Sequence, residues 1–359
     1  MGSPVNTIFY FYTRQATFID KDLAMLREKF RVITCAFPDP EKWKTPFLFL
    51  QQIFFLIRHI GSWRQASAMC QFAGYHSAIP SLWAWITGRP SIIVVGGTDC
   101  VSFPSLKYGH FQNRLLAFFT RLSYRLVKTV SAVHSSLFLR DNPYAGEAER
   151  KQGILHFMPD AKFVKNEIPN GFNTQWFCPE VPFERRPPLS FISISVSLDD
   201  SIRVRLKGID TVLELAKRMP DARFTLIGTR PVPHIIVPSN VELVPYVENA
   251  RLKEYYNRNR YYLQLSLSEG FPNALCEAMA CGCIPVVSAV ASMPEIAGEW
   301  GTVLPERNPD LLEEILRTRL QKSDSEEAAT SALVSESIAR RYSWERRKTG
   351  LWDLMGNVS

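Results

Sequence analysis

Short apolar runs alternate with helical stretches along the first half of the chain. The runs are rich in β-branched and aromatic residues, which favours strands, and apolar positions between them repeat at helical spacing. This alternation is typical of a parallel sheet with helices on both faces. The expected strands are 7–12, 32–37, 66–72, 91–95 and 129–133, and the expected helices are 18–30, about 78–86 and about 112–126.

A proline-rich stretch interrupts this alternation near the middle of the chain. Five prolines fall between Pro169 and Pro188, a density that suits a connector better than the inside of a helix or strand. A second series of the same kind follows. Its expected strands are 190–196, 223–227, 241–244, 261–267 and 284–287, and its expected helices are 209–218, 250–258, 273–280 and further C-terminal helices.

Length and pattern together predict an α/β protein with two Rossmann-like parallel-sheet domains that face an interdomain cleft. A chain of 359 residues suits two domains of roughly 150 residues each. Ligands of open parallel sheets bind outside the carboxyl ends of the strands, which would place a ligand in the cleft. The expected organisation is an N-terminal domain at 1–170, a hinge at 171–188, a C-terminal domain at 189–338 and a C-terminal helix at 339–359.

The composition limits the class of protein, the cellular compartment and the kind of partner that we expect. Hydrophobic residues make up 46% and charged residues 21%, as in an ordinary globular protein. The seven cysteines are scattered, form no CxxC pair and follow no secretory signal, so we expect reduced thiols and a cytoplasmic protein. A net charge of +7 favours an anionic partner, which could be a nucleotide-sugar, an anionic membrane surface or a nucleic acid. No nucleic-acid-binding motif supports the last of these.

The longest apolar run, Phe47 to Ile57, is too short to cross a bilayer. Its 11 residues rise about 16 Å as a helix, against about 30 Å of hydrocarbon. Arg58, Trp63 and Arg64 follow it. Two interpretations stay open, a helix buried in the first domain and a helix that lies on a membrane face.

The most informative segment runs from Ser268 to Gly282. We expect the end of a strand, a tight loop and a helix, with Asn273 as N-cap and Gly282 in the left-handed conformation after the last turn. Glu269 then lies in the loop, and Glu277 projects from the first helical turn toward the same end. Both carboxylates can accept hydrogen bonds from adjacent hydroxyls of one sugar or ribose, while the helix N-terminus favours a phosphate. Taken alone, the pair is also compatible with two solvated residues beside a cap.

The sequence around the two glutamates has a recognisable pattern. It comprises Glu269-x7-Glu277 within SEGFPNALCEAMACGCIPVV, and then MPEI from Met293, with IPNGFN from Ile168, KGID from Lys207, TLIG from Thr225 and YSWE from Tyr342. This pattern resembles the donor-site signature of the family 4 retaining glycosyltransferases, also called glycosyl transferases group 1, which have the GT-B fold. YSWE resembles the start of the helix that returns to the N-terminal lobe. The resemblance covers about 165–350 well and the first lobe weakly.

The resemblance implies transfer of a sugar from a nucleotide-diphosphate sugar to an acceptor hydroxyl, with retention of anomeric configuration. Glu269 would contact the hydroxyls of the transferred sugar, Glu277 the donor ribose, and Lys207 would neutralise the diphosphate leaving group. No cofactor and no metal are then required, and the sequence shows no cluster of metal ligands. The donor site would also include Gly270, Phe271, Pro272, Asn273, Ala274, Leu275 and Gly228.

One departure from the family's pattern concerns a second phosphate ligand. Family members usually carry an Arg just after the first strand of the C-terminal lobe, whereas this chain has Ser195 and Ser197 there. Arg203 or Arg205, shortly before Lys207, is expected to take that role. The other interpretation of the two arginines is a pair of solvated side chains.

The first lobe is expected to supply the acceptor side. Asp99 follows the strand 91–95 directly, so we expect its carboxylate to face the cleft, with Thr98 beside it. In many family members a His-Asp pair or similar polar group in this loop touches the transferred sugar. His76 is a further acceptor-side candidate, ahead of His110. A turn or cap role for Asp99 and a structural role for His76 stay open.

The acceptor is expected to be a saccharide or a lipid-linked saccharide. The basic and aromatic residues Trp43, Phe47, Phe54, Trp63 and Arg64 favour an acceptor presented by a membrane, as in cell-envelope polysaccharide or glycolipid assembly. We therefore expect a cytoplasmic protein with peripheral contact at the inner face of an anionic membrane. Alternatives with the same fold are a catalytically inactive scaffold or partner subunit, and a nucleotide-sugar epimerase-like enzyme or phosphorylase.

Overall fold

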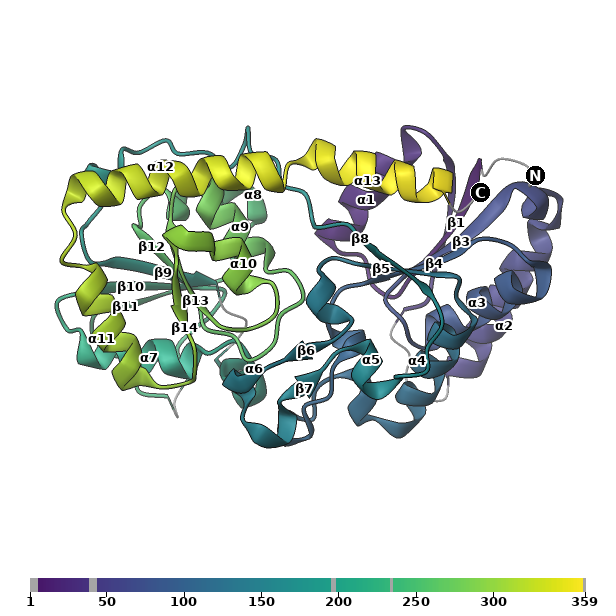
Figure 1. The fold of residues 1–359 in the computed structure, drawn as a ribbon, viewed down its shortest axis with the longest axis horizontal. Helices are drawn as coiled ribbons and strands as arrows, with labels where there is room; N and C mark the ends of the chain where they lie inside the picture. Colours follow the sequence, from purple (N-terminus) through teal and green to yellow (C-terminus); the bar gives the residue numbers. More distant parts are fainter. Residues whose placement is uncertain (1–5, 39–43, 195–197, 233–234, 358–359) are drawn as a thin grey trace. The chain divides into compact units, whose positions relative to one another are not determined.

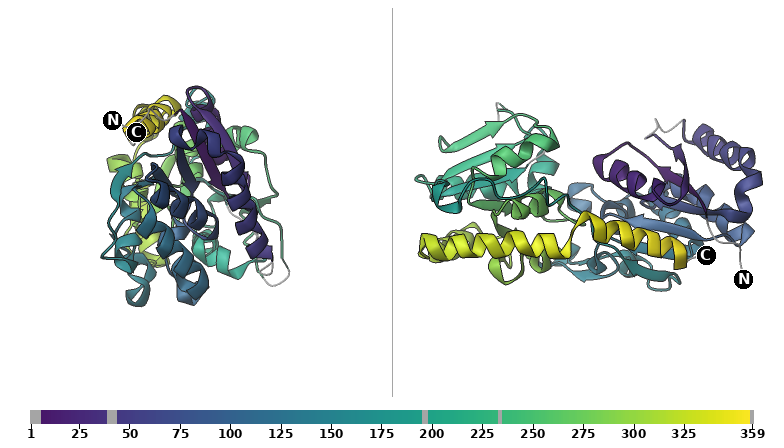
Figure 2. Two further views of the ribbon diagram at one scale, coloured as in Figure 1. Left: turned by 90° about the vertical axis from the view of Figure 1, so that its right-hand side faces the viewer. Right: turned by 90° about the horizontal axis from the view of Figure 1, so that it is seen from above.

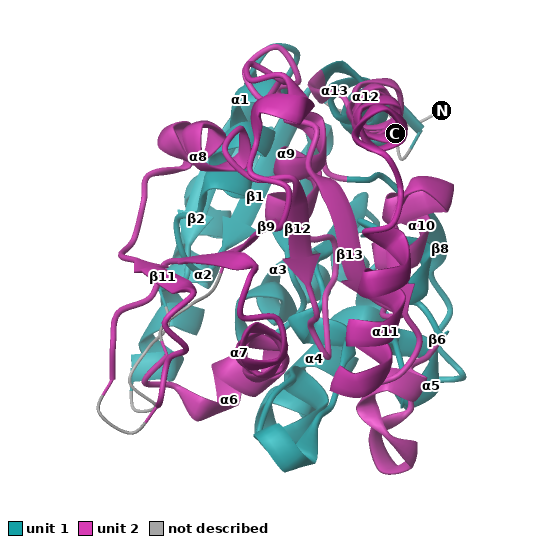
Figure 3. Ribbon diagram, turned by 90° about the vertical axis from the view of Figure 1, so that its left-hand side faces the viewer, with its two compact units in different colours: residues 1–140, 151–169, 345–359 teal, residues 141–150, 170–344 magenta. Residues whose placement is uncertain are grey.

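Two compact units make up the chain. The structure is a computed structural model that describes residues 6–38, 44–194, 198–232 and 235–357 (Figure 1, with two further views in Figure 2). Figure 3 colours the units separately. The first unit comprises 1–140, 151–169 and 345–359, and the second comprises 141–150 and 170–344.

The first unit is built on a six-stranded sheet in which every neighbouring pair of strands is parallel. Its order is β2-β1-β3-β4-β5-β8, so the chain starts inside the sheet and crosses over to both sides. The strands are β1 (Thr7–Tyr12), β2 (Arg31–Ala36), β3 (Ala66–Gln71), β4 (Ser91–Val95), β5 (Thr129–Ala132) and β8 (Val164–Glu167). The sequence pattern missed β8, since this edge strand has the mostly polar sequence VKNE and buries none of it fully.

Helices of the first unit connect these strands, and a helix from the far end of the chain completes it. They are α1 (Thr17–Arg27), α2 (Thr45–Arg58), α3 (Tyr75–Thr87), α4 (Arg114–Leu126) and α13 (Trp344–Asn357), apart from short helical turns. Figure 1 shows α13 in yellow beside α1. A buried ion pair joins the two helices, because both guanidinium nitrogens Nε and Nη2 of Arg347 lie 2.6 Å from the carboxylate of Asp22.

The second unit repeats the parallel architecture with the order β11-β10-β9-β12-β13-β14. Phe191 of β9 stacks on Phe224 of β10 and on Tyr261 of β12, with ring centroids 5.0 and 5.1 Å apart. The strands are β9 (Ser190–Ile194), β10 (Arg223–Ile227), β11 (Val241–Val244), β12 (Tyr261–Gln264), β13 (Ile284–Ser288) and β14 (Thr302–Leu304). The helices include α6 (Ser201–Leu206), α7 (Ile209–Arg218), α8 (Asn249–Tyr256), α9 (Asn273–Ala280), α10 (Met293–Ala297), α11 (Pro309–Arg319) and α12 (Asp324–Arg341). The predicted α/β class with two parallel-sheet domains is confirmed.

One segment packs away from its neighbours in sequence. Residues 141–150 run from the second residue of the two-residue strand β6 (Arg140–Asp141) to the residue before β7 (Lys151–Gln152), yet they belong to the second unit (Figure 3). Two hydrogen bonds of 2.7 Å from Arg150 to the carboxylate of Asp141 close the segment at its base. The sequence pattern placed these residues in the first domain.

The apolar run Phe47–Ile57 forms most of α2, which lies at the outside of the first unit in Figures 1 and 2. Among the described residues, no helix combines the length and the hydropathy that crossing a bilayer demands.

Candidate active site

The central feature of the second unit is an ion pair between Lys207 and Glu269. Nζ of Lys207 lies 2.6 Å from Oε1 of Glu269, and the side chains are 28% and 11% exposed. Lys207 is the residue after α6, and Glu269 follows the end of β12. The backbone N–H of Leu267 donates to the carbonyl oxygen of Leu206 at 2.8 Å, so the two segments are fixed directly beside the charged residues.

Two further donors hold the same oxygen of Glu269. Oγ of Ser266 lies 2.8 Å from Oε1 and Nε2 of Gln264 lies 3.1 Å from it. The hydroxyl of Tyr262 in turn donates to the amide oxygen of Gln264 at 3.1 Å. Burial raises the pKa of Tyr262 well above its ordinary value, so the phenol remains a neutral donor. The orientation of Glu269 therefore does not depend on Lys207 alone.

The sequence contained a signal for these residues that our prediction did not use. From position 263 the chain alternates Leu with polar residues as Leu-Gln-Leu-Ser-Leu-Ser. Alternate residues of a strand share one side of the sheet, so the polar positions fall together. Gln264 and Ser266 are buried, at 6% and 0% exposure, where a polar side chain needs a hydrogen-bonding partner.

Gly208 explains how Lys207 comes so close to the strand end. Its φ is +70°, and a Cβ at this position would lie 2.0 Å from the carbonyl oxygen of Leu265. Glycine alone lacks the atom that would collide there and tolerates the left-handed conformation. Gly208 therefore allows the close approach of the two segments that places Lys207 beside the end of the strand.

The second glutamate, Glu277, lies buried in α9. Nδ2 of Asn249, the first residue of α8, is 3.1 Å from Oε1 and 3.0 Å from Oε2 of Glu277. The amide thus bridges both carboxylate oxygens and fixes their plane. Sequence reasoning missed Asn249, because an Asn at the start of a helix is ordinarily a cap.

The start of α9 differs in one detail from the prediction. Pro272 takes the N-cap position and Asn273 is the first helical residue. The side chain of Asn273 is engaged elsewhere, since its Oδ1 accepts a hydrogen bond of 2.8 Å from Nδ2 of Asn170. Gly282 has φ +80°, as predicted for the residue that ends the helix.

The part of the chain that contains these residues is similar to known proteins. Residues 199–322 match the family model described as "Glycosyl transferases group 1". The second unit thus carries a segment that matches the glycosyl transferases group 1 family. The chain is 31% identical over 109 residues to the O-antigen chain mannosyltransferase B of Escherichia coli, covering 30% of this chain and 28% of that protein. It is 30% identical over 156 residues to a component of the phosphatidylinositol N-acetylglucosaminyltransferase of Arabidopsis thaliana, covering 40% of this chain and 33% of that protein. The chain thus spans about a third of the length of these curated relatives.

Solved structures extend the comparison to the whole chain. The sucrose-phosphate synthase of Thermosynechococcus elongatus superposes with a TM-score of 0.69 at 14% identity, over 97% of this chain and 98% of that chain. The Anabaena protein HepE, in complex with UDP-glucose, gives a TM-score of 0.66 at 13% identity, again over 97% and 98%. At these identities the likeness concerns the fold alone, which is the GT-B fold with its two parallel-sheet units.

The remaining donor-side candidates of the second unit fall into two sets. Phe271 and Leu275 are buried, and Phe271 packs on Phe172 and Tyr342 with centroids 6.2 and 5.1 Å apart. Gly270 and Pro272 are also buried, while Ala274 is half-buried. Such residues can offer a ligand only their backbone groups, which is the role that the family resemblance implies. Gly228 follows β10 directly, with φ +90°.

The two candidate arginines lie on α6, ahead of Lys207. Arg203 is exposed and pairs with Asp200, whose carboxylate lies 3.1 Å from its Nε, and Arg205 is exposed as well. Both side chains are therefore accessible to solvent. Ser195 and Ser197, where the family usually has its Arg, lie outside the described residues.

Asp99 requires a correction. It was expected to face a ligand, but its carboxylate is completely buried within the first unit. Oδ2 accepts hydrogen bonds from the backbone N–H of Ala73 at 2.9 Å and from the hydroxyl of Tyr124 at 3.0 Å, while Oδ1 accepts from the N–H of Gly97 at 3.3 Å. Asp99 therefore ties together the loops that follow β3 and β4.

The other acceptor-side candidates of the first unit are enclosed to different degrees. His76 is buried, its Nε2 lies 2.7 Å from the carbonyl oxygen of Gln71, and burial lowers its pKa to about 4. Burial likewise lowers the pKa of His110, whose residue is half-buried. Thr98 is half-buried too, with its hydroxyl 3.2 Å from that of Tyr108. Of the four candidates, Thr98 and His110 are thus partly open to solvent, and Asp99 and His76 are closed to it.

Proposed function

We propose that the protein transfers a sugar from a nucleotide-diphosphate sugar to an acceptor hydroxyl, with retention of anomeric configuration. The observation that carries this proposal is the Lys207–Glu269 pair at the carboxyl edge of a parallel sheet in a group 1 unit. The matched relatives are named as mannosyl- and N-acetylglucosaminyltransferases, and the similar HepE structure holds UDP-glucose. Both facts support a nucleotide-sugar as the donor.

Lys207 is proposed to stabilise the leaving diphosphate. Negative charge grows on the phosphate as the glycosidic bond breaks, and a cation positioned in advance stabilises that charge without reorganisation. When Lys207 turns from Glu269 to a phosphate, Ser266 and Gln264 still hold Oε1 of Glu269. Glu269 is then ready to accept hydrogen bonds from hydroxyls of the transferred sugar.

Glu277 is proposed to bind the donor ribose. Asn249 fixes the plane of its carboxylate before any ligand arrives, which reduces the conformational entropy lost on binding. A carboxylate can accept hydrogen bonds from two adjacent hydroxyls, which is the arrangement that a ribose presents.

The acceptor hydroxyl is proposed to attack on the face from which the diphosphate departs. Its proton is proposed to pass to a phosphate oxygen of that diphosphate. The burial of Asp99 and His76 supports this route, because neither side chain of the first unit is placed to act as a general base. No metal or other cofactor is part of the proposal, since Lys207 supplies the cation. Among the described residues, no group of three or more His, Cys, Asp or Glu side chains is arranged to hold a metal ion.

The acceptor is proposed to be a saccharide or lipid-linked saccharide in cell-envelope polysaccharide or glycolipid assembly, at the cytoplasmic face of a membrane. The names of the relatives, which refer to an O-antigen chain and to phosphatidylinositol, support this class. A catalytically inactive scaffold with the same fold is the alternative, and the complete set of Lys207, Glu269 and Glu277 argues against it.

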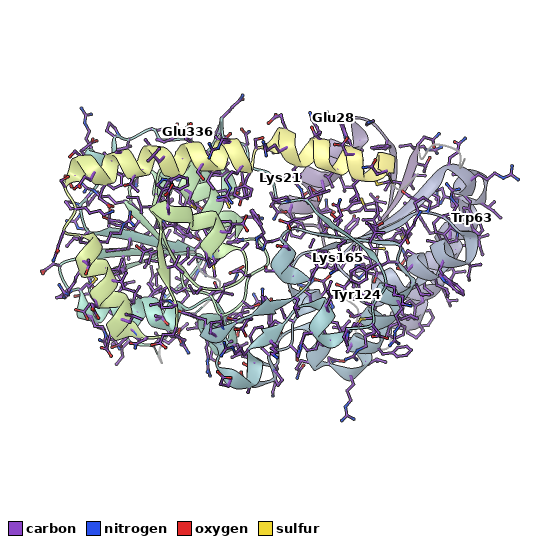
Figure 4. The ribbon with its side chains drawn as sticks, in the orientation of Figure 1. Lys21, Glu28, Trp63, Tyr124, Lys165 and Glu336 are labelled. Atoms are coloured by element: carbon purple, nitrogen blue, oxygen red, sulfur yellow. The ribbon has the colours of Figure 1, made fainter. Side chains whose placement is uncertain are left out.

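A donor panel tests the proposal. Purified protein is incubated with UDP-, GDP-, ADP- and CMP-sugars, and both thermal stabilisation and nucleotide release are recorded. We expect one donor to stabilise the wild type and the Glu336→Ala control, whose exposed side chain lies on α12 (Figure 4), but not Glu277→Ala. If no donor stabilises the wild type or releases nucleotide, the scaffold alternative is favoured.

A further inference from the structure

Helix α2 exposes its apolar side chains and buries a polar one. Phe47, Leu50, Phe54 and Ile57 follow one another at helical spacing and are 63%, 61%, 64% and 57% exposed, whereas Gln52 is fully buried. A helix on the surface of a water-soluble domain normally shows the opposite arrangement. The apolar face of α2 is therefore directed away from the core of its own unit.

This orientation of α2 is fixed by specific contacts. The ring of Phe55 packs edge-on against Phe9 and Phe11 of β1, with centroids 5.5 and 5.6 Å apart. Nε2 of Gln52 donates to the carbonyl oxygen of His76 at 2.7 Å, which ties the buried side chain of α2 to the start of α3. Turning the helix to hide its apolar face would break these contacts.

The apolar surface continues onto the two neighbouring helices. Phe119 of α4 lies 5.3 Å from Phe49 of α2 and 5.1 Å from Tyr75 of α3, measured between ring centroids. We call this surface the α2–α4 face. It comprises, besides the four residues of α2, the exposed side chains of Ile53, Ile60, Leu82, Trp85, Ile86, Leu115 and Phe118.

A groove of about 270 Å³ runs between α2 and α3 within this face. Its walls are aliphatic and aromatic apart from Thr87. Trp63, labelled in Figure 4, packs edge-on against Trp83 at one wall, with centroids 5.7 Å apart. Sites for whole small molecules usually have about 300–1,000 Å³ and a few polar groups, so this groove suits a segment of hydrocarbon better.

The positive charge of the chain is concentrated in the sequence segment that carries this face. Residues 44–128 contain nine Lys and Arg residues and a single acidic one, the buried Asp99. Nine positive charges less one give +8, compared with +7 for the whole chain, so everything outside this segment sums to −1. Arg58, Arg64 and Arg114 are among the exposed cations. Two copies of this face would repel each other, whereas an anionic surface would be attracted.

We propose that the α2–α4 face docks on a membrane containing anionic lipids, and that the groove between α2 and α3 receives a hydrocarbon chain of that membrane. The exposed rings and aliphatic side chains enter the boundary between headgroups and acyl chains, and the surrounding cations contact the lipid phosphates. Docking itself is independent of the proposed sugar transfer. Only the consequence that a lipid-linked acceptor meets the enzyme at this face rests on it.

Vesicle sedimentation with a matched pair of variants tests docking. Ile57→Glu introduces a charge on the face, and Ile236→Glu introduces the same charge at a position of the second unit that is 86% exposed. With vesicles of equal parts phosphatidylcholine and phosphatidylglycerol, we expect wild type and Ile236→Glu to sediment, and Ile57→Glu to bind at least about tenfold more weakly. Binding should weaken with phosphatidylcholine alone and with added salt. Wild type that stays in the supernatant, or Ile57→Glu that binds like wild type, would overturn the proposal.

Brominated acyl chains test the groove. Bromine quenches tryptophan fluorescence at short range, and Trp63 lines the groove. Replacing Trp63 by Phe should lower the quenching, while Trp176→Phe, at a half-exposed position of the second unit, should keep it. Equal quenching in both variants would contradict a hydrocarbon chain in the groove. The docking proposal would also be contradicted if the wild type bound no vesicles and instead self-associated in a way that Ile57→Glu abolishes. Thermal stabilisation by the donor is measured on the same variants, so a failed docking test and a failed donor site are told apart.

Discussion

Asn142 donates a hydrogen bond from its side-chain Nδ2 to the carbonyl oxygen of Leu267 at 3.0 Å, although 125 positions separate the two residues. Since the N–H of Leu267 is bonded to the carbonyl of Leu206, both backbone groups of Leu267 are occupied. Leu267 lies two residues before Glu269. The segment 141–150 therefore supports the donor loop from outside the sheet that carries it.

Replacing Asn142 by Ala should destabilise the second unit and disturb the donor site together. The buried carbonyl of Leu267 loses its donor, which costs about 1–3 kcal/mol of the free energy of unfolding. Urea unfolding measures this cost, and nucleotide release should fall in the same variant. Glu147→Ala, on the same segment and 87% exposed, is the control and should change stability by no more than about 0.5 kcal/mol. Equal stability of the two variants would contradict the supporting role.

Removal of the Lys207 cation should lower the turnover of the donor more than its binding. Lys207→Ala is expected to reduce kcat for nucleotide release by about 10²–10³-fold, because the charge acts mainly on the departing diphosphate. Arg203→Ala and Arg205→Ala provide the comparison, since both side chains are exposed on α6. We expect losses below about tenfold for them. A loss as large as that of Lys207→Ala would instead identify the second phosphate ligand.

Gly208→Ala should destabilise the protein by about 2 kcal/mol or more, since it combines a left-handed backbone with a collision at the carbonyl oxygen of Leu265. Thermal or urea unfolding measures the effect. Gly356→Ala is the matched substitution, because a Cβ there meets no atom within 4 Å. It should leave stability unchanged or raise it slightly. The idea fails if Gly208→Ala is as stable as Gly356→Ala.

Stability should fall as the pH drops through the range in which His76 would ordinarily titrate. The folded protein holds the ring neutral, with a pKa of about 4, because the ring is buried. Below its usual pKa of about 6.5 the unfolded chain binds a proton that the folded chain refuses, so between about pH 7.5 and pH 5 the loss from His76 is about 2 kcal/mol. The lowered pKa of His110 acts in the same direction.

Urea unfolding at several pH values measures this dependence. His76→Gln should flatten it, while His156→Gln, at an exposed position, should leave it unchanged. An identical pH dependence in His76→Gln and wild type would exclude His76 as its source.

Local patterns predicted much of the fold. Strands β1, β4, β10 and β11 and helices α7 and α9 have the bounds that the alternation of apolar positions predicted. The failures have physical reasons. The edge strand β8 buries none of its residues fully, so it carries no apolar pattern. The segment 141–150 joins the second unit through tertiary contacts such as that of Asn142, which no local pattern encodes.

The candidate site also contains residues that the sequence indicated and residues whose orientation it could not predict. The sequence singled out Lys207 and Glu269 because each lies in a recognisable motif at the end of an expected element, and the structure brings the two side chains into contact. Asp99 was placed correctly at the end of β4, but a sequence does not tell which way a loop side chain turns. Here the N–H groups of Ala73 and Gly97 draw its carboxylate inward.

The ion pair between Arg347 and Asp22 has a consequence for the order of folding. The ribosome makes α13 after all of the second unit, whose main segment, 170–344, is continuous in sequence. The first unit cannot be completed before Arg347 has been synthesised, because Asp22 lacks until then the cation that compensates its burial. The lobe translated first is thus the last to be completed, in contrast to the usual order from the N-terminus.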